Sequence, residues 1–318
     1  MLLGGLTLAL VAVGCGDDDG GERADSGGAS VRTVIELPDS QPGDVIALRP
    51  ADGESSVVEW IDRRNGTIRS IDVAVADPSS DDIVVLASLE VGTDGEQRGL
   101  LGHTVIDGVR YAAWTDSDTD HLLVGALGDG APATIDRIIW DAGGTAGGAV
   151  GGHLDVTPDG QLILGIGQLT DWAKDHGSGA MLGLDPAGPP DQDPVVLSDG
   201  YTNPFAFAVV ADQLWVADNA VDDDTERTGS FDLTDPSGRL DRSDLDATGS
   251  SPRAPSAVIA VPGGDVAVCG FLDSELRRWS TDPPGYGDVL GPCLTGAAAL
   301  PDGTIVTATA DGLVAIAP

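Results

Sequence analysis

Apolar residues along this chain fall in short segments of about five to nine residues, which is the usual length of a β-strand. Valine is frequent in these segments, and Gly, Pro and Asp separate them. No stretch of the body has the periodicity of an amphipathic helix of three turns. The 45 glycines and 20 prolines supply turns at short intervals. The pattern therefore predicts an all-β chain.

One unit recurs about every fifty residues: an apolar strand, a tight turn and a second apolar strand. The turns are Asp52-Gly53, Asp107-Gly108, Asp159-Gly160, Ala211-Asp212, Gly263-Gly264 and Asp302-Gly303. Units of this size match a four-stranded propeller blade, and blades bury their faces by stacking around an axis. We predict a six-bladed β-propeller of four-stranded antiparallel blades over residues 32–318. The segment near Val31 is expected to complete the C-terminal blade.

The N-terminal residues have a different pattern. Leu2 to Val13 is an apolar run of the length of a signal-peptide core, too short to span a bilayer. It ends in AVGC at 12–15, which resembles the lipobox of bacterial lipoproteins. We therefore predict a lipoprotein signal peptide over 1–15, lipidation of Cys15, and a flexible acidic Gly/Ser linker over 16–31.

This reading places the protein outside the cytoplasm of a bacterium, periplasmic or on the cell surface, with membrane contact only through its lipid anchor. A plain secretory signal, or a buried strand with an incidental Cys15, are the alternatives. Apart from Cys15 the sequence has two cysteines, Cys269 and Cys293. In an exported protein such a pair predicts a disulfide, and two buried free thiols are the alternative.

Charge excludes one class of partner. The formal net charge is −36, with only 16 Lys and Arg residues. A polyanion such as nucleic acid would be repelled by this surface. The four histidines are dispersed, without the spacing of a zinc site. An acidic surface fits solubility, tolerance of salt or affinity for divalent cations.

Four motifs, in order along the chain, resemble the glucose/sorbosone dehydrogenase family. They are GEQRGLLG at 95–102; GGHL at 151–154 with PDG at 158–160 and GQ at 167–168; TNPFAF at 202–207 with LWVADN at 214–219; and the strand-turn-strand around PDG at 301–303. The resemblance covers residues from about 32 to 318. It implies a six-bladed propeller, and in the best-known members it implies sugar oxidation with pyrroloquinoline quinone (PQQ) and Ca²⁺.

The catalytic residues of that family are not all present. The resemblance places the general base, a histidine, at Ala149, which cannot take a proton. His153 and His176 flank loops expected to line the propeller mouth, and each is a possible substitute or a structural residue. Gln97, Gln168 and Asn203 are the remaining candidates for cofactor binding, and a structural role in turns and loops is the alternative for Gln97 and Asn203.

The cations that a tricarboxylate such as PQQ requires are also missing from the expected positions. The resemblance places them at Thr202, Leu272, Cys293 and Thr295. The sequence therefore argues against PQQ, although the family implies it.

A calcium site is the remaining cofactor hypothesis. Family Ca²⁺ ligands correspond roughly to Ala220, Val221 and Glu226, beside the acidic run 222–224. A flexible acidic loop without metal is the alternative reading.

Three functions follow from these observations. The leading hypothesis is an exported propeller that has lost PQQ chemistry and binds a small, sugar-like ligand or a surface protein. The second is an active aldose dehydrogenase with a rebuilt quinone site, and the third is a Ca²⁺-dependent lactonase-like enzyme. Whether the protein is an enzyme stays open at this stage.

Overall fold

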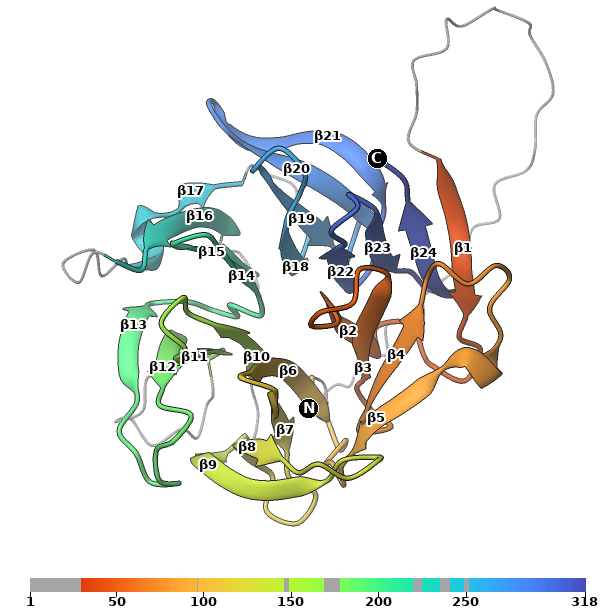
Figure 1. Cartoon of the computed structure of the whole chain (residues 1–318). Coiled ribbons are helices and arrows are strands. Elements are labelled where there is room, and N and C mark those ends of the chain that lie inside the picture. The colour runs from red at the N-terminus through yellow and green to blue at the C-terminus, as the bar shows by residue number, and fades with distance from the viewer. Residues whose placement is uncertain are drawn as a thin grey trace, which may run out of the picture.

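A computed structural model of the chain describes residues 30–95, 97–145, 149–168, 178–219, 225–234, 241–248 and 252–318. Its strands form six four-stranded antiparallel sheets. These sheets are arranged as blades around a central axis (Figure 1). The all-β six-bladed propeller predicted from the turn repeat is therefore confirmed.

The first three blades follow one another along the chain. Blade 1 contains β2 (Val45–Pro50), β3 (Val57–Asp62), β4 (Thr67–Asp72) and β5 (Val84–Ser88). Blade 2 contains β6 (Leu100–Ile106), β7 (Val109–Thr115), β8 (His121–Leu127) and β9 (Ile135–Gly144). Blade 3 contains β10 (Gly151–Val156), β11 (Leu162–Ile166), β12 (Ala180–Leu184) and β13 (Val195–Asp199). A short 3₁₀ helix, η1 (Ser80–Asp82), precedes β5.

The remaining blades complete the ring. Blade 4 contains β14 (Ala206–Val210), β15 (Gln213–Asp218), β16 (Arg227–Asp232) and β17 (Asp246–Ala247), with the 3₁₀ helix η2 (Arg242–Asp244) before β17. Blade 5 contains β18 (Pro255–Ala260), β19 (Val266–Gly270), β20 (Glu275–Thr281) and β21 (Pro284–Pro292). Blade 6 contains β22 (Gly296–Ala299), β23 (Ile305–Ala308), β24 (Gly312–Ile316) and, from the other end of the chain, β1 (Val31–Glu36).

Strand β1 closes the ring. It pairs antiparallel with β24, from Val31 opposite Ile316 to Glu36 opposite Gly312, and the two strands lie side by side in Figure 1. The expected pairing of the segment near Val31 with the C-terminal blade is confirmed. The strand begins one residue before the predicted domain boundary at residue 32.

The six predicted turns all join the first and second strands of a blade. Each needs a residue with positive φ, which glycine adopts without steric cost. Five turns place a glycine there, for example Gly108 at φ +81°. In blade 4, Ala211 takes this conformation at φ +54°. The turn chemistry therefore fixes the blade repeat locally.

Buried apolar residues gather between neighbouring blades. The clusters in the described part of the chain follow the blade interfaces, so that blades 6 and 1 share Trp60 and blades 1 and 2 share Trp114. Both rings are fully buried, as is Trp140 between blades 2 and 3. A blade cannot bury both faces alone, so this packing between blades is what stabilises the ring. None of the described helices is long and apolar enough to cross a membrane.

Candidate functional site

A cavity of about 410 Å³ lies where the inner strands begin, and we call it the mouth cavity. Gly151 and Pro255, the first residues of β10 and β18, both line it. The loops that enter the other blades supply most of the remaining wall. Its lining includes Arg63, Gln97, Asn203, Phe205, Phe271 and Thr295.

Asn203 and Gln97 meet in this cavity, although 106 residues separate them in sequence. The Asn203 side-chain amide donates to Oε1 of Gln97 at 3.3 Å. Asn203 is only 4 % exposed, and its Oδ1 is buried without a hydrogen-bond partner. A buried acceptor left unpaired costs free energy, so this oxygen is suited to a donor from a ligand or a water molecule.

Asp218, at the end of β15, holds Asn203 in place. Its Oδ1 accepts the backbone N–H of Asn203 at 2.8 Å and that of Thr202 at 3.0 Å. Asp218 is fully buried, and Arg242 donates to its other oxygen. Burial raises the pKa of the Asp218 carboxyl, and the hydrogen bond from Arg242 opposes that rise. The buried ion pair of Asp218 with Arg242 therefore fixes the backbone at Thr202 and Asn203.

Gln97 is positioned by the backbone of its own loop. It adopts φ +55°, which turns its side chain toward the axis against the usual preference of a non-glycine residue. The next residue, Arg98, is buried and donates to Asp94 O and to Asp120 Oδ1, both at 2.9 Å. These contacts fix the loop on both sides of the glutamine.

Arg63 brings a cation to the mouth cavity, where it shares the carboxylate of Asp44 with Arg64. One Nη donates to Asp44 Oδ1 at 2.8 Å, and the other donates to the carbonyl of Arg98 at 2.6 Å. Asp44 is 3 % exposed and also accepts from Arg64. Burial lowers the pKa of Arg63, whereas Asp44 raises it. Among the described residues that line this cavity, no other carries a positive charge.

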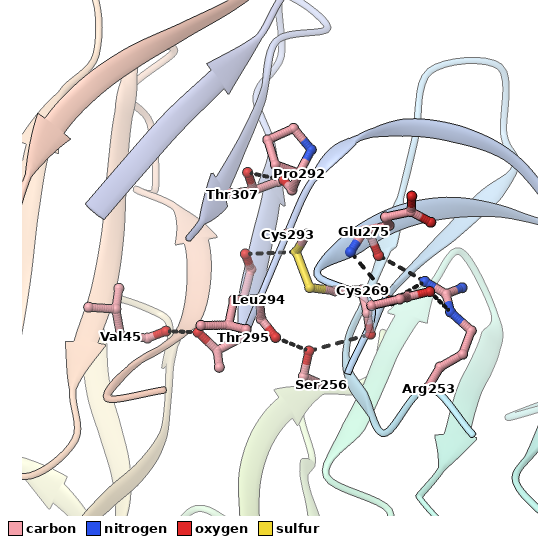
Figure 2. The surroundings of a disulfide bond; sticks show 12 residues. Val45, Arg253, Ser256, Cys269, Glu275, Pro292, Cys293, Leu294, Thr295 and Thr307 are labelled. Carbon is pink, nitrogen blue, oxygen red and sulfur yellow. Dashed lines mark hydrogen bonds and ion pairs between the residues drawn. A yellow bond between two sulfur atoms is a disulfide. The ribbon is translucent and has the colours of Figure 1, made fainter. Parts of the chain in front are cut away.

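A disulfide between Cys269 and Cys293 braces one wall, the pairing expected from the sequence (Figure 2). On the far side of Cys293, the Leu294 carbonyl accepts from Ser256 Oγ at 2.8 Å. Thr295 Oγ1 donates to the Val45 carbonyl at 2.6 Å and so joins this wall to blade 1. Phe271, two residues after Cys269, is 43 % exposed at the cavity.

The other residues expected at the site lie elsewhere. Gln168 is exposed, and only its backbone N–H bonds the neighbouring loop, at Thr202 O. Ala149 does not line the mouth cavity, and its carbonyl lies against Gly167. His153 was expected to flank a loop of the mouth; it follows Gly151 by two residues and lines the central channel below. It is the third residue of β10, and the inner strand carries it away from the opening.

Glu226 uses its carboxylate within the protein. Both oxygens accept the Arg253 N–H, at 3.0 and 2.9 Å, and Oε1 also accepts the Ala254 N–H at 2.6 Å. The described residues contain no group of three acidic, His or Cys side chains placed to hold a metal. The calcium hypothesis also rests on Ala220 and Val221, which lie outside the described residues, as do Cys15 and His176.

Sequence reasoning missed three residues of this site: Arg63, Asp218 and Phe271. The sequence could have indicated Asp218, because this residue belongs to the LWVADN motif that was already singled out. Arg63 and Phe271 gave no such signal, since they belong to turns whose approach to the axis depends on the closed ring.

No protein-family model and no curated protein matches the sequence. Solved structures do match. A Thermus thermophilus oxidoreductase described as a glucose dehydrogenase has a TM-score of 0.65 and 19 % identity, over 91 % of this chain and all of that one. The PQQ-bound aldose sugar dehydrogenase of Streptomyces coelicolor has a TM-score of 0.66 and 18 % identity, over 91 % of this chain and 98 % of that one.

A more distant match is a calcium structure of a Trichoderma reesei carbohydrate-active enzyme of family AA12, with a TM-score of 0.61 and 10 % identity. It covers 92 % of this chain and 96 % of that one. At these identities the likeness concerns the fold, since one propeller architecture hosts many activities. The chain is thus similar in fold to sugar dehydrogenases, which confirms the six-bladed propeller expected from the motifs.

Proposed function

We propose that this protein binds a small, uncharged polar molecule of the sugar type in the mouth cavity, without quinone chemistry. The single observation that carries the proposal is the buried, unpaired Oδ1 of Asn203, beside the Gln97 amide. Side-chain amides can both donate to and accept from hydroxyl groups, which are the groups that a sugar presents. Phe205 and Phe271 add apolar surface to the same cavity, as small-molecule sites commonly do.

Charge supports a neutral ligand over the quinone of the similar dehydrogenases. A tricarboxylate needs several cations close by. The described lining offers one cation, Arg63, which is hydrogen-bonded to Asp44 and to the Arg98 carbonyl. Thr202 and Thr295 stand where cations were expected, and the Thr295 hydroxyl bonds Val45 O. These residues do not fit PQQ.

The proposal extends to location. We propose that the propeller works outside the cytoplasm, tethered through a lipidated Cys15, because the apolar run before that cysteine and the acidic, Gly-rich segment after it suit an anchor and a linker. Metabolic labelling with a fatty acid tests this. Label on the wild-type chain and none on Cys15→Ala supports the anchor, and no label on either chain contradicts it.

Isothermal titration calorimetry of the full chain with a panel of neutral aldoses and polyols tests the ligand. We expect a saturable signal for at least one neutral ligand, and at least tenfold weaker binding in Asn203→Ala, since a lost buried hydrogen bond costs about 1.5 kcal/mol. Gln213→Ala is the matched control, because it removes an amide from the opposite end of blade 4.

The same protein is then mixed with PQQ and Ca²⁺. A saturable quinone absorbance, or dye reduction with an aldose, would refute the binding-only proposal in favour of a dehydrogenase. Lactone hydrolysis that depends on Ca²⁺ would favour the lactonase alternative instead. Equal affinities of wild type and Asn203→Ala for every neutral ligand would remove the mouth cavity from the proposal.

A further inference from the structure

A second cavity, of about 310 Å³, occupies the central channel below the mouth, and we call it the channel cavity. All six inner strands line it, and it shares Phe205 and Ser256 with the mouth cavity. Four charged or titratable side chains line it: Arg49, His103, His153 and Asp155. The proposed function at the mouth uses none of these four.

Two nitrogen atoms of this lining lack a partner. Nη1 of Arg49 and Nδ1 of His153 are buried and make no hydrogen bond. The arginine is fixed by its other Nη, which donates to Asp52 Oδ1 at 2.7 Å. The His153 ring is held edge-on against Phe207 at 4.8 Å between centroids. Both groups are therefore held in place without being satisfied.

The acidic groups nearby do not satisfy them. Glu59 has a bidentate pair with Arg110, at 2.7 and 2.8 Å, which leaves it 3.6 Å from Arg49 Nη1. Asp155 accepts two backbone N–H groups, from Val156 on Oδ1 and from Val209 on Oδ2, each at 2.7 Å. Arg49 Nη1 therefore has a long ion pair with Glu59 but no hydrogen-bond acceptor among the described residues.

His103 is not a competing cation. Its Nε2 lies 3.0 Å from the Ala47 carbonyl and donates to it, so its Nδ1 is an acceptor facing Arg110 at 3.3 Å. Burial, with Arg49 and Arg110 close by, holds the pKa of His103 well below its usual value. Burial likewise lowers the pKa of His153 to about 4. Both imidazoles are neutral near pH 7, and His153 can donate from Nδ1.

We propose that the channel cavity binds a small monovalent anion, a halide or a short carboxylate, between Arg49 and His153. A guanidinium N–H and an imidazole N–H are both donors to such an anion, and in a buried site these charge-assisted bonds are strong. The net charge of −36 repels anions from the surface, so anion binding in the channel cavity depends on the Arg49 guanidinium, with Arg110 close by.

Binding is coupled to a proton on Asp155. Two arginines, Arg49 on β2 and Arg110 on β7, face one glutamate, Glu59 on β3, so this group has a net charge of +1. An ionised Asp155 on β10 cancels that charge. The histidines on β6 and β10 are neutral, and β14, β18 and β22 add no charged residue to this lining. Burial raises the pKa of Asp155 to about 6. The anion therefore binds more tightly below pH 6, by about tenfold at pH 5 relative to pH 7.5.

Thermal unfolding of the full chain, with sodium formate or sodium bromide added at constant ionic strength, tests the proposal. We expect a saturable rise in Tm in the wild type, with a lower half-saturating concentration at pH 5 than at pH 7.5. Arg49→Gln should abolish the rise, and Asp155→Asn should abolish its pH dependence. Arg277→Gln, which removes a guanidinium paired with Glu275 on β20, is the matched control and should keep it.

Equal salt effects in wild type and Arg49→Gln would mean an ordinary salt effect and overturn the proposal. In case Arg49→Gln fails to fold, bromide-soaked crystals of the wild type give a second readout. Anomalous density between Arg49 and His153 supports the site, and ordered water there instead refutes it. Asn203→Ala should leave the anion effect unchanged, so this result and the mouth-cavity result can fail independently. The anion with the lower half-saturating concentration identifies the preferred class.

Discussion

Replacing both Cys269 and Cys293 with alanine is expected to destabilise the propeller by about 3.5 kcal/mol. The disulfide joins residues separated by 24 positions. Cross-linking a loop of that size removes chain entropy from the unfolded state, by roughly this amount at 25 °C. Both cysteines are fully buried between blades 5 and 6, so lost packing adds to the entropic cost.

Differential scanning calorimetry and urea unfolding measure the effect. For a propeller of this size, a loss of about 3.5 kcal/mol lowers the Tm by roughly 6 °C. Wild-type protein unfolded in the presence of a strong phosphine reductant is the control, because it keeps both sulfur atoms and loses only the bond. We expect the reduced wild type to account for most of the loss in the double variant.

The reasoning is refuted if the reduced wild type and the double variant each lose less than about 1 kcal/mol. The bond would then add little to what the blade interface already supplies. Because the Cys293 segment continues into Thr295 at the mouth cavity, neutral-ligand affinity should also fall in the double variant. Unchanged affinity would show that Thr295 is held by its bond to Val45 alone.

Three further predictions concern buried groups. Arg110→Leu leaves Glu59 buried without its bidentate partner, so the free energy of unfolding in urea should fall by about 3–5 kcal/mol. Adding Glu59→Gln should restore part of this stability, and purely additive effects of the two substitutions would contradict the pairing. The folded-state pKa of Asp155 is about 6, above its unfolded value of 3.8, so the stability it contributes is present below about pH 4 and is lost as pH rises to 6. Asp155→Asn should therefore flatten the stability profile between pH 4 and 6, with a gain of about 1 kcal/mol at pH 7.5 after allowance for partial exposure; an unchanged slope would refute the shift. Ile35→Asp puts a charge into the buried interface of β1 with blade 1, so it should lower the free energy of unfolding by at least about 3 kcal/mol and speed proteolysis in the region of β1. Equal cleavage rates in wild type and variant would contradict a closed ring.

The propeller could be predicted from the sequence because its determinants are local. A strand alternates over a few residues, and a turn such as Asp107-Gly108 needs only positive φ at one or two positions. Counting such turns gives the number of blades, and the first strand is left over to complete the last blade. Each of these inferences depends on neighbours in sequence.

The mouth cavity depends on residues far apart in sequence, so it was predicted only in part. Gln97 and Asn203 were singled out, but their contact requires the φ of +55° at Gln97 and the support of Asp218 under Asn203. Arg63 reaches the cavity from the β3–β4 turn. Its ion pair with Asp44 forms only in the folded ring, so the sequence does not reveal it. His153 follows the mouth residue Gly151 by two positions and lines the channel cavity, because position along an inner strand sets depth in the channel.

Ring closure by β1 has a consequence for the order of folding. Strand β1 pairs with β24, which is made after the strands of all the other blades, so the ring cannot close until all six blades have been made. Until then β1 has no partner strand and blade 1 has an uncovered face, both of which invite pairing with other chains. The slow step should be this end-to-end docking, since contacts with the largest sequence separation require the costliest loop closure.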